Sequence, residues 1–305
     1  MLSLGIWQFS NDEVATAVKQ ALSVGIDHFD ASIFYGTPEN DGQPNQPALG
    51  RALAGIPRSQ YFLLTKIDPS YMDSDEYSIV TEKFTRSNAY YRTLEQAAHN
   101  LGDLGLEYVD VMLVHWSMSD CVVMQETWRA MEEVHRLGWA KAIGVSNYCP
   151  NTLQCILSKA KIVPAINQVL YHVGMEAPIA PLNEFSGPHD IKVQAYSPLG
   201  SGGKHHSNDL ISGPLVTSIG AAHGKTGAQV ALRYLAQRGV PFSTKSLSAQ
   251  HMRESMDVFN FELSDDEMQQ LDAYVSDDKA YSFTCDCKAT GSCGEHGGGY
   301  ESPYA

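Results

Sequence analysis

Positive charge is scarce in this sequence. Its 21 lysines and arginines are outnumbered by 35 aspartates and glutamates, which gives a formal net charge of -14. Binding to phosphate backbones or anionic membranes requires a basic field. The acidic balance therefore argues against nucleic acid and against a membrane surface as partners, and a bound phosphate would need a local cluster of basic residues.

Long hydrophobic runs are also missing. No window approaches the uninterrupted apolar length of a membrane span, and the N-terminus, MLSLGIWQFSNDEV, has no basic segment of the kind that opens a signal peptide. We therefore expect a soluble, cytoplasmic protein. The chain has only 6 cysteines, and without a secretory signal we do not expect a disulfide framework.

A glycine-rich loop is absent after the first predicted strand. Residues 4–8 (LGIWQ) are followed by SNDE, in which Ser10 and Glu13 have the spacing of a helix capping box. An open, doubly wound nucleotide-binding sheet usually has glycines at this point. The sequence therefore disfavours that architecture.

Strand and helix patterns alternate along the chain without a break in composition. This favours an α/β fold, a single (β/α)8 TIM barrel over residues 1–275, followed by an irregular Gly- and Cys-rich tail over 276–305. Long loops are expected at the carboxyl ends of the strands, over 37–47, 68–86, 174–188 and 201–214. The predicted strands are 4–8, 25–32, 61–67, 108–116, 140–148, 164–172, 191–200 and 239–246.

Ionisable residues end three of these strands. Alternation places Asp30, Lys66 and His115 on inward faces at the carboxyl ends, with Tyr35 in the loop above. Asp30 alone could be a turn or helix cap, and His115 alone could be a hydrogen-bonded core residue. A lysine inside a barrel needs a carboxylate partner, and Asp30 could be that partner.

Together these four residues suit proton transfer. A phenol has an ordinary pKa near 10, and a neighbouring lysine cation is expected to lower the pKa of Tyr35. The carboxylate of Asp30 would hold Lys66, while His115 would hydrogen-bond a substrate oxygen. The pattern predicts a general-acid site for reducing a carbonyl.

Later strand ends offer groups for a hydride donor. Ser146, Asn147 and Gln168 are suited to a carboxamide, and the ring of Tyr196 could stack on a flat heterocycle. Each of these could also be a turn or core residue. Basic residues that suit phosphate occur in this acidic chain at Lys204, His205, His206 and Lys245.

With these residues in place, the sequence resembles the aldo-keto reductase superfamily from Leu4 to about Val275. The resemblance is specific in order and spacing. The motifs that carry it are D-x-A-x-x-Y at 30–35, TK at 65–66, LVHW at 113–116, GVSNY at 144–148, NQ at 167–168, YSPLG at 196–200 and KS at 245–246.

The resemblance implies a (β/α)8 barrel that reduces a small-molecule carbonyl with NADPH, NADH being possible, as a monomer or small homo-oligomer. It makes Tyr35 the general acid, Lys66 and Asp30 its tuning pair, and His115 the group that orients the carbonyl. Trp7 and Trp116 would line the substrate pocket, or else be core aromatics. The implied cofactor-binding residues are Ser146, Asn147, Gln168, Tyr196, Ser197, Leu199, Lys245, Ser246, His251, Glu254 and Ser255.

The chain departs from the family pattern in several places. His251 stands where many members have an arginine, the usual N-terminal hairpin under the barrel is largely absent, which suggests a truncated start, and residues 37–47 form an insertion. The tail contains potential zinc ligands, but their spacing is not that of common zinc modules, so we predict no metal site. These tail residues are Cys285, Cys287, Cys293 and His296.

Two other function classes fit parts of the pattern. A nucleotide-binding regulatory subunit of the same fold would need little turnover, but the presence of all four reaction residues favours an enzyme. A metal-dependent barrel hydrolase would need clustered ligands, and only His28, Asp30 and His115 are available at strand ends. With Asp30 and His115 committed elsewhere, His28 is expected to be structural or to line a pocket.

Overall fold

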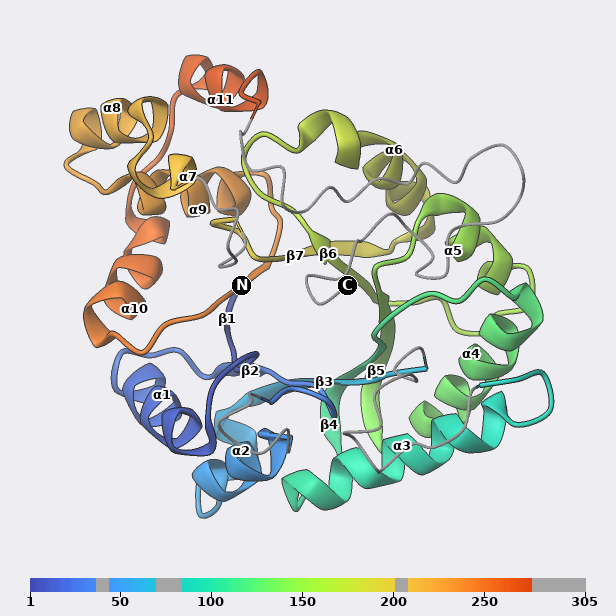
Figure 1. Ribbon diagram of the computed structural model, residues 1–305. Coiled ribbons are helices and arrows are strands. Elements are labelled where there is room, and N and C mark those ends of the chain that lie inside the picture. Colours follow the sequence, from blue (N-terminus) through green and yellow to red (C-terminus); the bar gives the residue numbers. More distant parts are fainter. Residues whose placement is uncertain (37–43, 70–83, 201–207, 276–305) are drawn as a thin grey trace.

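Eight parallel strands form a closed barrel in sequence order, with the last strand pairing with the first (Figure 1). The computed structural model describes residues 1–36, 44–69, 84–200 and 208–275. The predicted (β/α)8 architecture is confirmed. The strands are β1 Leu2–Gly5, β2 His28–Asp30, β3 Phe62–Ile67, β4 Val109–Val114, β5 Ala140–Ser146, β6 Ile166–Leu170, β7 Lys192–Tyr196 and β8 Phe242–Thr244.

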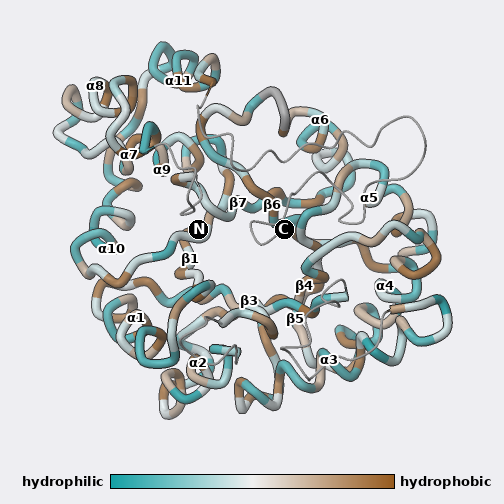
Figure 2. The backbone as a smooth tube through the Cα atoms, viewed as in Figure 1, coloured by the Kyte–Doolittle hydropathy of each residue, from teal (hydrophilic) through white to brown (hydrophobic). Residues whose placement is uncertain are grey.

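Helices surround the barrel (Figure 1). Hydrophobic residues lie along the strands, whereas many helix positions that face outward are hydrophilic (Figure 2). The predicted capping box at Ser10 and Glu13 is confirmed at the start of α1. The helices are α1 Asn11–Ser23, α2 Gln46–Leu53, α3 Ala89–Leu104, α4 Cys121–Arg136, α5 Pro150–Leu157, α6 Glu176–Ser186, α7 Asp209–Ser212, α8 Pro214–His223, α9 Gly227–Gln237, α10 Ala249–Met256 and α11 Asp265–Asp272.

Alternation along the strands separates two hydrophobic layers. Met112 and Val114 of β4 belong to the large core between strands and helices, whereas Val111 and Leu113 point into the barrel. The interior cluster is Leu64, Val111 and Leu113, with Phe62, Ala142 and Ile166 packed against them. This apolar cluster forms a plug inside the barrel, below the carboxyl ends of the strands.

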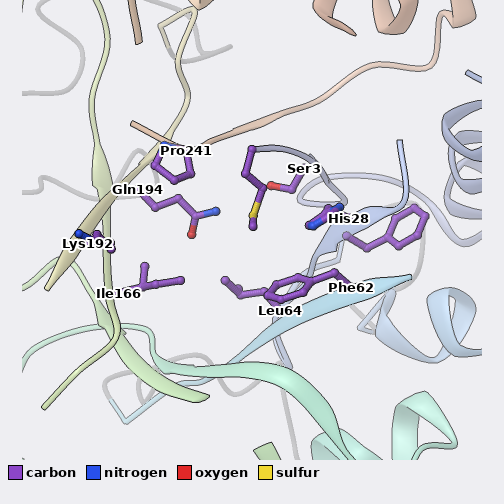
Figure 3. Close-up of a pocket in the computed structure, with 10 residues that line it drawn as sticks. Ser3, His28, Phe62, Leu64, Ile166, Lys192, Gln194 and Pro241 are labelled. Atoms are coloured by element: carbon purple, nitrogen blue, oxygen red, sulfur yellow. The ribbon is translucent and has the colours of Figure 1, made fainter. Parts of the chain in front are cut away.

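A cavity of about 160 Å³ lies at the amino ends of the strands, below the plug (Figure 3). His28 is among its lining residues and stacks on Phe62 with ring centroids 4.9 Å apart. The ring Nδ1 of His28 also pairs with Asp27 at 2.6 Å. The structure therefore places His28 at the opposite end of the barrel from Lys66, in the structural role expected for it.

Two sequence expectations are wrong. Residues 174–188 were expected to be a loop, but α6 occupies most of them, because Ile179 and Leu182 bury completely against the barrel despite Pro181 inside the helix. Cys121 and Cys155 form a disulfide between α4 and α5, with Cα atoms 5.8 Å apart. The two cysteines are 34 residues apart in sequence, and only the packing of adjacent helices brings them together.

Several expectations fall outside the described residues. These include most of the 37–47 insertion, most of the 68–86 connection, the basic residues Lys204, His205 and His206, and the whole tail from 276, with its cysteines and His296. In the described ranges, none of the helices combines the length and apolar character needed to cross a bilayer.

Candidate active site

Lys66 connects the acid and the phenol at the carboxyl end of the barrel. Its side chain is fully buried at the end of β3, and its Nζ pairs with Oδ1 of Asp30 on neighbouring β2. The same Nζ donates a hydrogen bond to Oη of Tyr35 at 3.0 Å and to the carbonyl of Ala31 at 3.0 Å. The predicted partnership of Lys66 and Asp30 is therefore present in the structure.

The second carboxylate oxygen of Asp30 is held from across the barrel. Nε2 of Gln168 on β6 donates to Oδ2 of Asp30 at 2.6 Å, and the same nitrogen is 3.2 Å from Oε1 of Gln194. Gln168 was expected to bind a carboxamide, but here its amide nitrogen anchors Asp30. Both oxygens of this buried carboxylate thus have donors, as a buried charge requires.

The electrostatics at Tyr35 differ from the sequence expectation. Burial, followed by the carboxylates of Asp30 and Asp68, raises the pKa of Tyr35 well above its ordinary value. Burial lowers the pKa of Lys66, although Asp30 and Asp68 oppose that shift. The net pKa of Tyr35 is therefore raised and not lowered as the sequence suggested, because burial disfavours the phenolate and two carboxylates add to that effect.

His115 lies directly after β4 and faces Tyr35. The two rings are edge to face, with centroids 5.8 Å apart, and the His115 ring stacks on Trp116 at 5.3 Å. Nδ1 of His115 lies 3.1 Å from Oδ2 of Asp68 and 3.4 Å from Oγ of Ser32. His115 is thus positioned by polar contacts from two other connections.

Asp68 is a site residue that the sequence reasoning missed. It is 2% exposed and directly follows β3, at the start of a stretch predicted to be a loop. The signal was available, because strand alternation continues the inward series Leu64, Lys66 to Asp68. An acid at that position predicts a second buried carboxylate at the strand ends.

The groups expected to hold a carboxamide gather around Asn147. Its Nδ2 donates to the carbonyl of His115 and to Oγ of Ser146, each at 3.1 Å, while its Oδ1 accepts from Oη of Tyr196 at 3.0 Å. Asn147 has a φ of 60°, a left-handed conformation that asparagine tolerates better than most residues. Ser146 pairs in register with Gln168, so these amides lie beside the Asp30 and Lys66 pair.

The residues expected to bind phosphate and adenine lie on the β8 side. Nζ of Lys245 is 3.4 Å from the carbonyl of Gln8 and lies over the rings of Trp7 and Phe9, at 6.0 and 5.0 Å. Ser246 accepts a hydrogen bond from the backbone of Ser248 at 3.0 Å. Trp7, expected in the substrate pocket, therefore lies under a cation that could hold phosphate.

The remaining expected cofactor residues lie on α10 and after β7. The backbone N–H of His251 donates to the N-cap Ser248 at 3.3 Å, and the Glu254 side chain accepts from Gln250 at 3.0 Å. Ser255 follows on the same helix. After β7, Ser197 has a φ of 48° and Leu199 packs against the core. No described hydrogen bond joins α10 to the Lys66 cluster.

Metal chemistry finds no support in the described part of the chain. No group of three or more His, Cys, Asp and Glu side chains there could hold an ion. Of the three strand-end ligands considered for a hydrolase, His28 lines the cavity at the amino ends of the strands, which Asp30 and His115 do not line.

The comparisons with known proteins agree with this geometry. The model of the Aldo/keto reductase family matches residues 1–276. An aldo-keto reductase of Mycobacterium sp. (strain JLS) is 31% identical over 294 residues, which cover 93% of this chain and 94% of that protein. Morphine 6-dehydrogenase of Pseudomonas putida is 32% identical over 282 residues, covering 89% and 86%.

A solved structure gives the same picture. The crystal structure of an aldo/keto reductase from Brucella melitensis superposes with a TM-score of 0.73 at 31% identity, covering 89% of this chain and 93% of that one. Fold, motifs and relatives converge, and the chain belongs to the aldo/keto reductase family of NAD(P)H-dependent oxidoreductases.

Proposed function

We propose that the protein reduces an aldehyde or ketone to the alcohol with NADPH, and that Tyr35 is the general acid. The observation that carries this proposal is the contact of one buried cation, Lys66 Nζ, with both the Asp30 carboxylate and the Tyr35 hydroxyl, the latter at 3.0 Å. A lysine donating to a phenol oxygen stabilises the phenolate that forms when the proton leaves.

Tyr35 begins the reaction as a neutral phenol. Burial and the nearby carboxylates raise its pKa, so the proton is present at neutral pH and is available to a carbonyl oxygen as that oxygen becomes an alkoxide. Lys66 then balances the new phenolate charge at 3.0 Å. Asp30, held by Gln168 at 2.6 Å, keeps the lysine in place through the cycle.

His115 orients the carbonyl. Its ring meets the Tyr35 ring at 5.8 Å, which leaves the two polar side chains on the same side of the strand mouth. Both can then contact one substrate oxygen, His115 as a hydrogen-bond partner and Tyr35 as the proton donor. Trp116, stacked on His115, would form an apolar wall for the substrate.

The donor set fits a nicotinamide cofactor, which supplies the hydride when bound. Ser146 and Asn147 place hydroxyl and amide groups at the end of β5, beside Gln168, which holds Asp30. Tyr196, hydrogen-bonded to Asn147 at 3.0 Å, offers an aromatic face. Ser197 and Leu199 continue this wall. Phosphate and adenine would be held by Lys245, Ser246, His251, Glu254 and Ser255.

The proposal is tested by measuring NADPH oxidation against aldehydes, quinones, keto-steroids and sugar aldehydes. Tyr35→Phe is expected to lower kcat at least about 100-fold while the Kd for NADPH, from fluorescence titration, changes little. Tyr61→Phe is the control, because Tyr61 is a buried tyrosine that precedes β3, at the other end of that strand from Lys66. Full turnover in Tyr35→Phe would contradict the assignment.

The regulatory alternative gives a different result in the same assay. A nucleotide-binding subunit would bind NADPH, oxidise it negligibly across the panel and co-purify with a stable partner. The choice of NADPH over NADH rests on the cation of Lys245. We expect Lys245→Met to weaken NADPH binding more than NADH binding, since only NADPH has the extra phosphate.

A further inference from the structure

We propose that Asp68 is a positioning residue that sets the protonation of the His115 ring, so that Asp68, His115 and the substrate oxygen form one hydrogen-bonded line. This inference rests on the proposed function, because it assigns how His115 meets the carbonyl. Asp68 and Asp30 are separate carboxylates. Asp68 follows β3 and contacts His115, whereas Asp30 lies on β2 and pairs with Lys66.

A side chain of helix α3 fixes the backbone of Asp68. Oε1 of Gln96 accepts from the backbone N–H of Asp68 at 2.7 Å, and Nε2 of Gln96 donates to its carbonyl at 3.1 Å. Gln96 itself is 3% exposed. The buried Gln96 amide thus makes two hydrogen bonds to the backbone of Asp68 and fixes it. The Asp68 carboxylate is thereby kept next to the His115 ring.

The contact with His115 selects one ring form. Oδ2 of Asp68 lies 3.1 Å from Nδ1 of His115, and an ionised carboxylate only accepts hydrogen bonds. Nδ1 therefore carries a proton, and Nε2 is the nitrogen directed to substrate. A carbonyl oxygen only accepts hydrogen bonds, so Nε2 binds it when that nitrogen also carries a proton.

The surrounding charges explain why a buried acid is tolerated here. Asp68 acts electrostatically on both Tyr35 and Lys66, so Lys66 partly offsets two carboxylates, and Nδ1 of His115 lies 3.1 Å from Oδ2 of Asp68. An acid with only a structural role would not need to contact the ring of His115, which faces Tyr35. Asp110 illustrates that other case, since it pairs with Arg58 at 2.6 Å near the start of β4.

The direct test observes the ring itself. In protein labelled with ¹⁵N-histidine, the His115 resonances are assigned as those lost in His115→Asn, and their shifts report which nitrogen is protonated. We expect a protonated Nδ1 in the wild-type protein without ligands. An unprotonated Nδ1 overturns the proposal, and this measurement needs no variant at Asp68.

The functional test uses Asp68→Asn, which keeps the shape and removes the charge. We expect kcat for carbonyl reduction to fall about 10- to 100-fold, KM for NADPH to stay within about twofold, and the His115 resonances to move. In the matched control, Asp110→Asn, we expect a lower Tm with kcat and the His115 resonances unchanged. Wild-type kcat in Asp68→Asn overturns the proposal.

The two proposals fail separately. If Tyr35→Phe retains turnover, the assigned acid is wrong whatever the state of His115. If Tyr35→Phe is inactive while Asp68→Asn has wild-type kcat, or Nδ1 is unprotonated, the reductase assignment stands and the role of Asp68 does not.

Discussion

Lys66 donates a hydrogen bond to the hydroxyl of Tyr35 at 3.0 Å, yet the phenol remains harder to ionise than a free tyrosine. Burial contributes most to this, and the carboxylates of Asp30 and Asp68 add to it. The contact with Lys66 therefore acts mainly after proton transfer, when the phenolate exists. In the resting protein it keeps the hydroxyl oriented.

This relationship predicts the titration of Tyr35. A raised pKa favours the neutral phenol, so Tyr35 should form no tyrosinate at or below pH 10, its ordinary pKa being about 10. The measurement is the difference in absorbance at about 295 nm between wild type and Tyr35→Phe as pH rises. A transition below pH 10 would mean that the Lys66 cation outweighs burial, as the sequence alone suggested.

Asp110 should make stability depend on pH in the acid range. Burial raises the pKa of Asp110, but hydrogen bonds from Arg58, the N–H of Leu63 and Lys141 outweigh burial and leave it below its ordinary value. A lowered folded-state pKa stabilises the protein above the unfolded pKa, about 3.9, and the stabilisation disappears as pH falls through the folded value.

The test is urea unfolding of wild type and Asp110→Asn between pH 7 and pH 3. The variant should lose about 3 kcal/mol at pH 7, because Arg58 is left without its partner. The gap should stay level down to about pH 5 and narrow only as pH falls toward and below the unfolded pKa of about 3.9. A gap that stays constant over this range would show that the charge of Asp110 contributes nothing.

The disulfide between Cys121 and Cys155 should stabilise the folded state. Closing a loop with a sequence separation of 34 residues restricts the unfolded chain, and the expected loss on removing it is about 3–4 kcal/mol. Cys121→Ser, Cys155→Ser and the double variant should unfold at nearly the same urea concentration, since each removes the same bond. Additive losses would indicate that the two cysteines contribute independently.

Gly144 should be intolerant of a side chain. A Cβ there would lie 2.6 Å from the carbonyl of Ile166 and 2.8 Å from the Leu113 side chain, so Gly144→Ala should cost about 2 kcal/mol by overpacking. Gly102→Ala is the matched control, because it adds a methyl group to α3 with nothing within 4 Å. That variant should be about 0.5–1 kcal/mol more stable.

The sequence predicted much of the fold because local signals were strong. The predicted capping box at Ser10 forms, and each predicted strand region overlaps an observed strand. The predicted bounds were wider than the observed strands at β2 and β8. Helix α6 was not predicted because prolines are typical of loops. Burial of Ile179 and Leu182 favours the helix nevertheless.

At the candidate site, the sequence predicted the pairing of Lys66 with Asp30 but not the second carboxylate, Asp68, or the contact of Gln168 with Asp30. The inward alternation of Asp30 and Lys66 follows from the period of a strand, and so their pairing was predictable. The role of Gln168 as an anchor of Asp30 depends on a contact across the barrel at 2.6 Å, which no local pattern encodes.

The sequence by itself determined the strand order, the inward positions and the motifs that mark the family, because these depend on residues near one another in the chain. Tertiary structure decided the rest. Closure of the barrel brings Asp68 to His115, Gln168 to Asp30 and Cys121 to Cys155. Electrostatic energies depend on separation and burial, so only the folded chain could show that Tyr35 is held as a phenol.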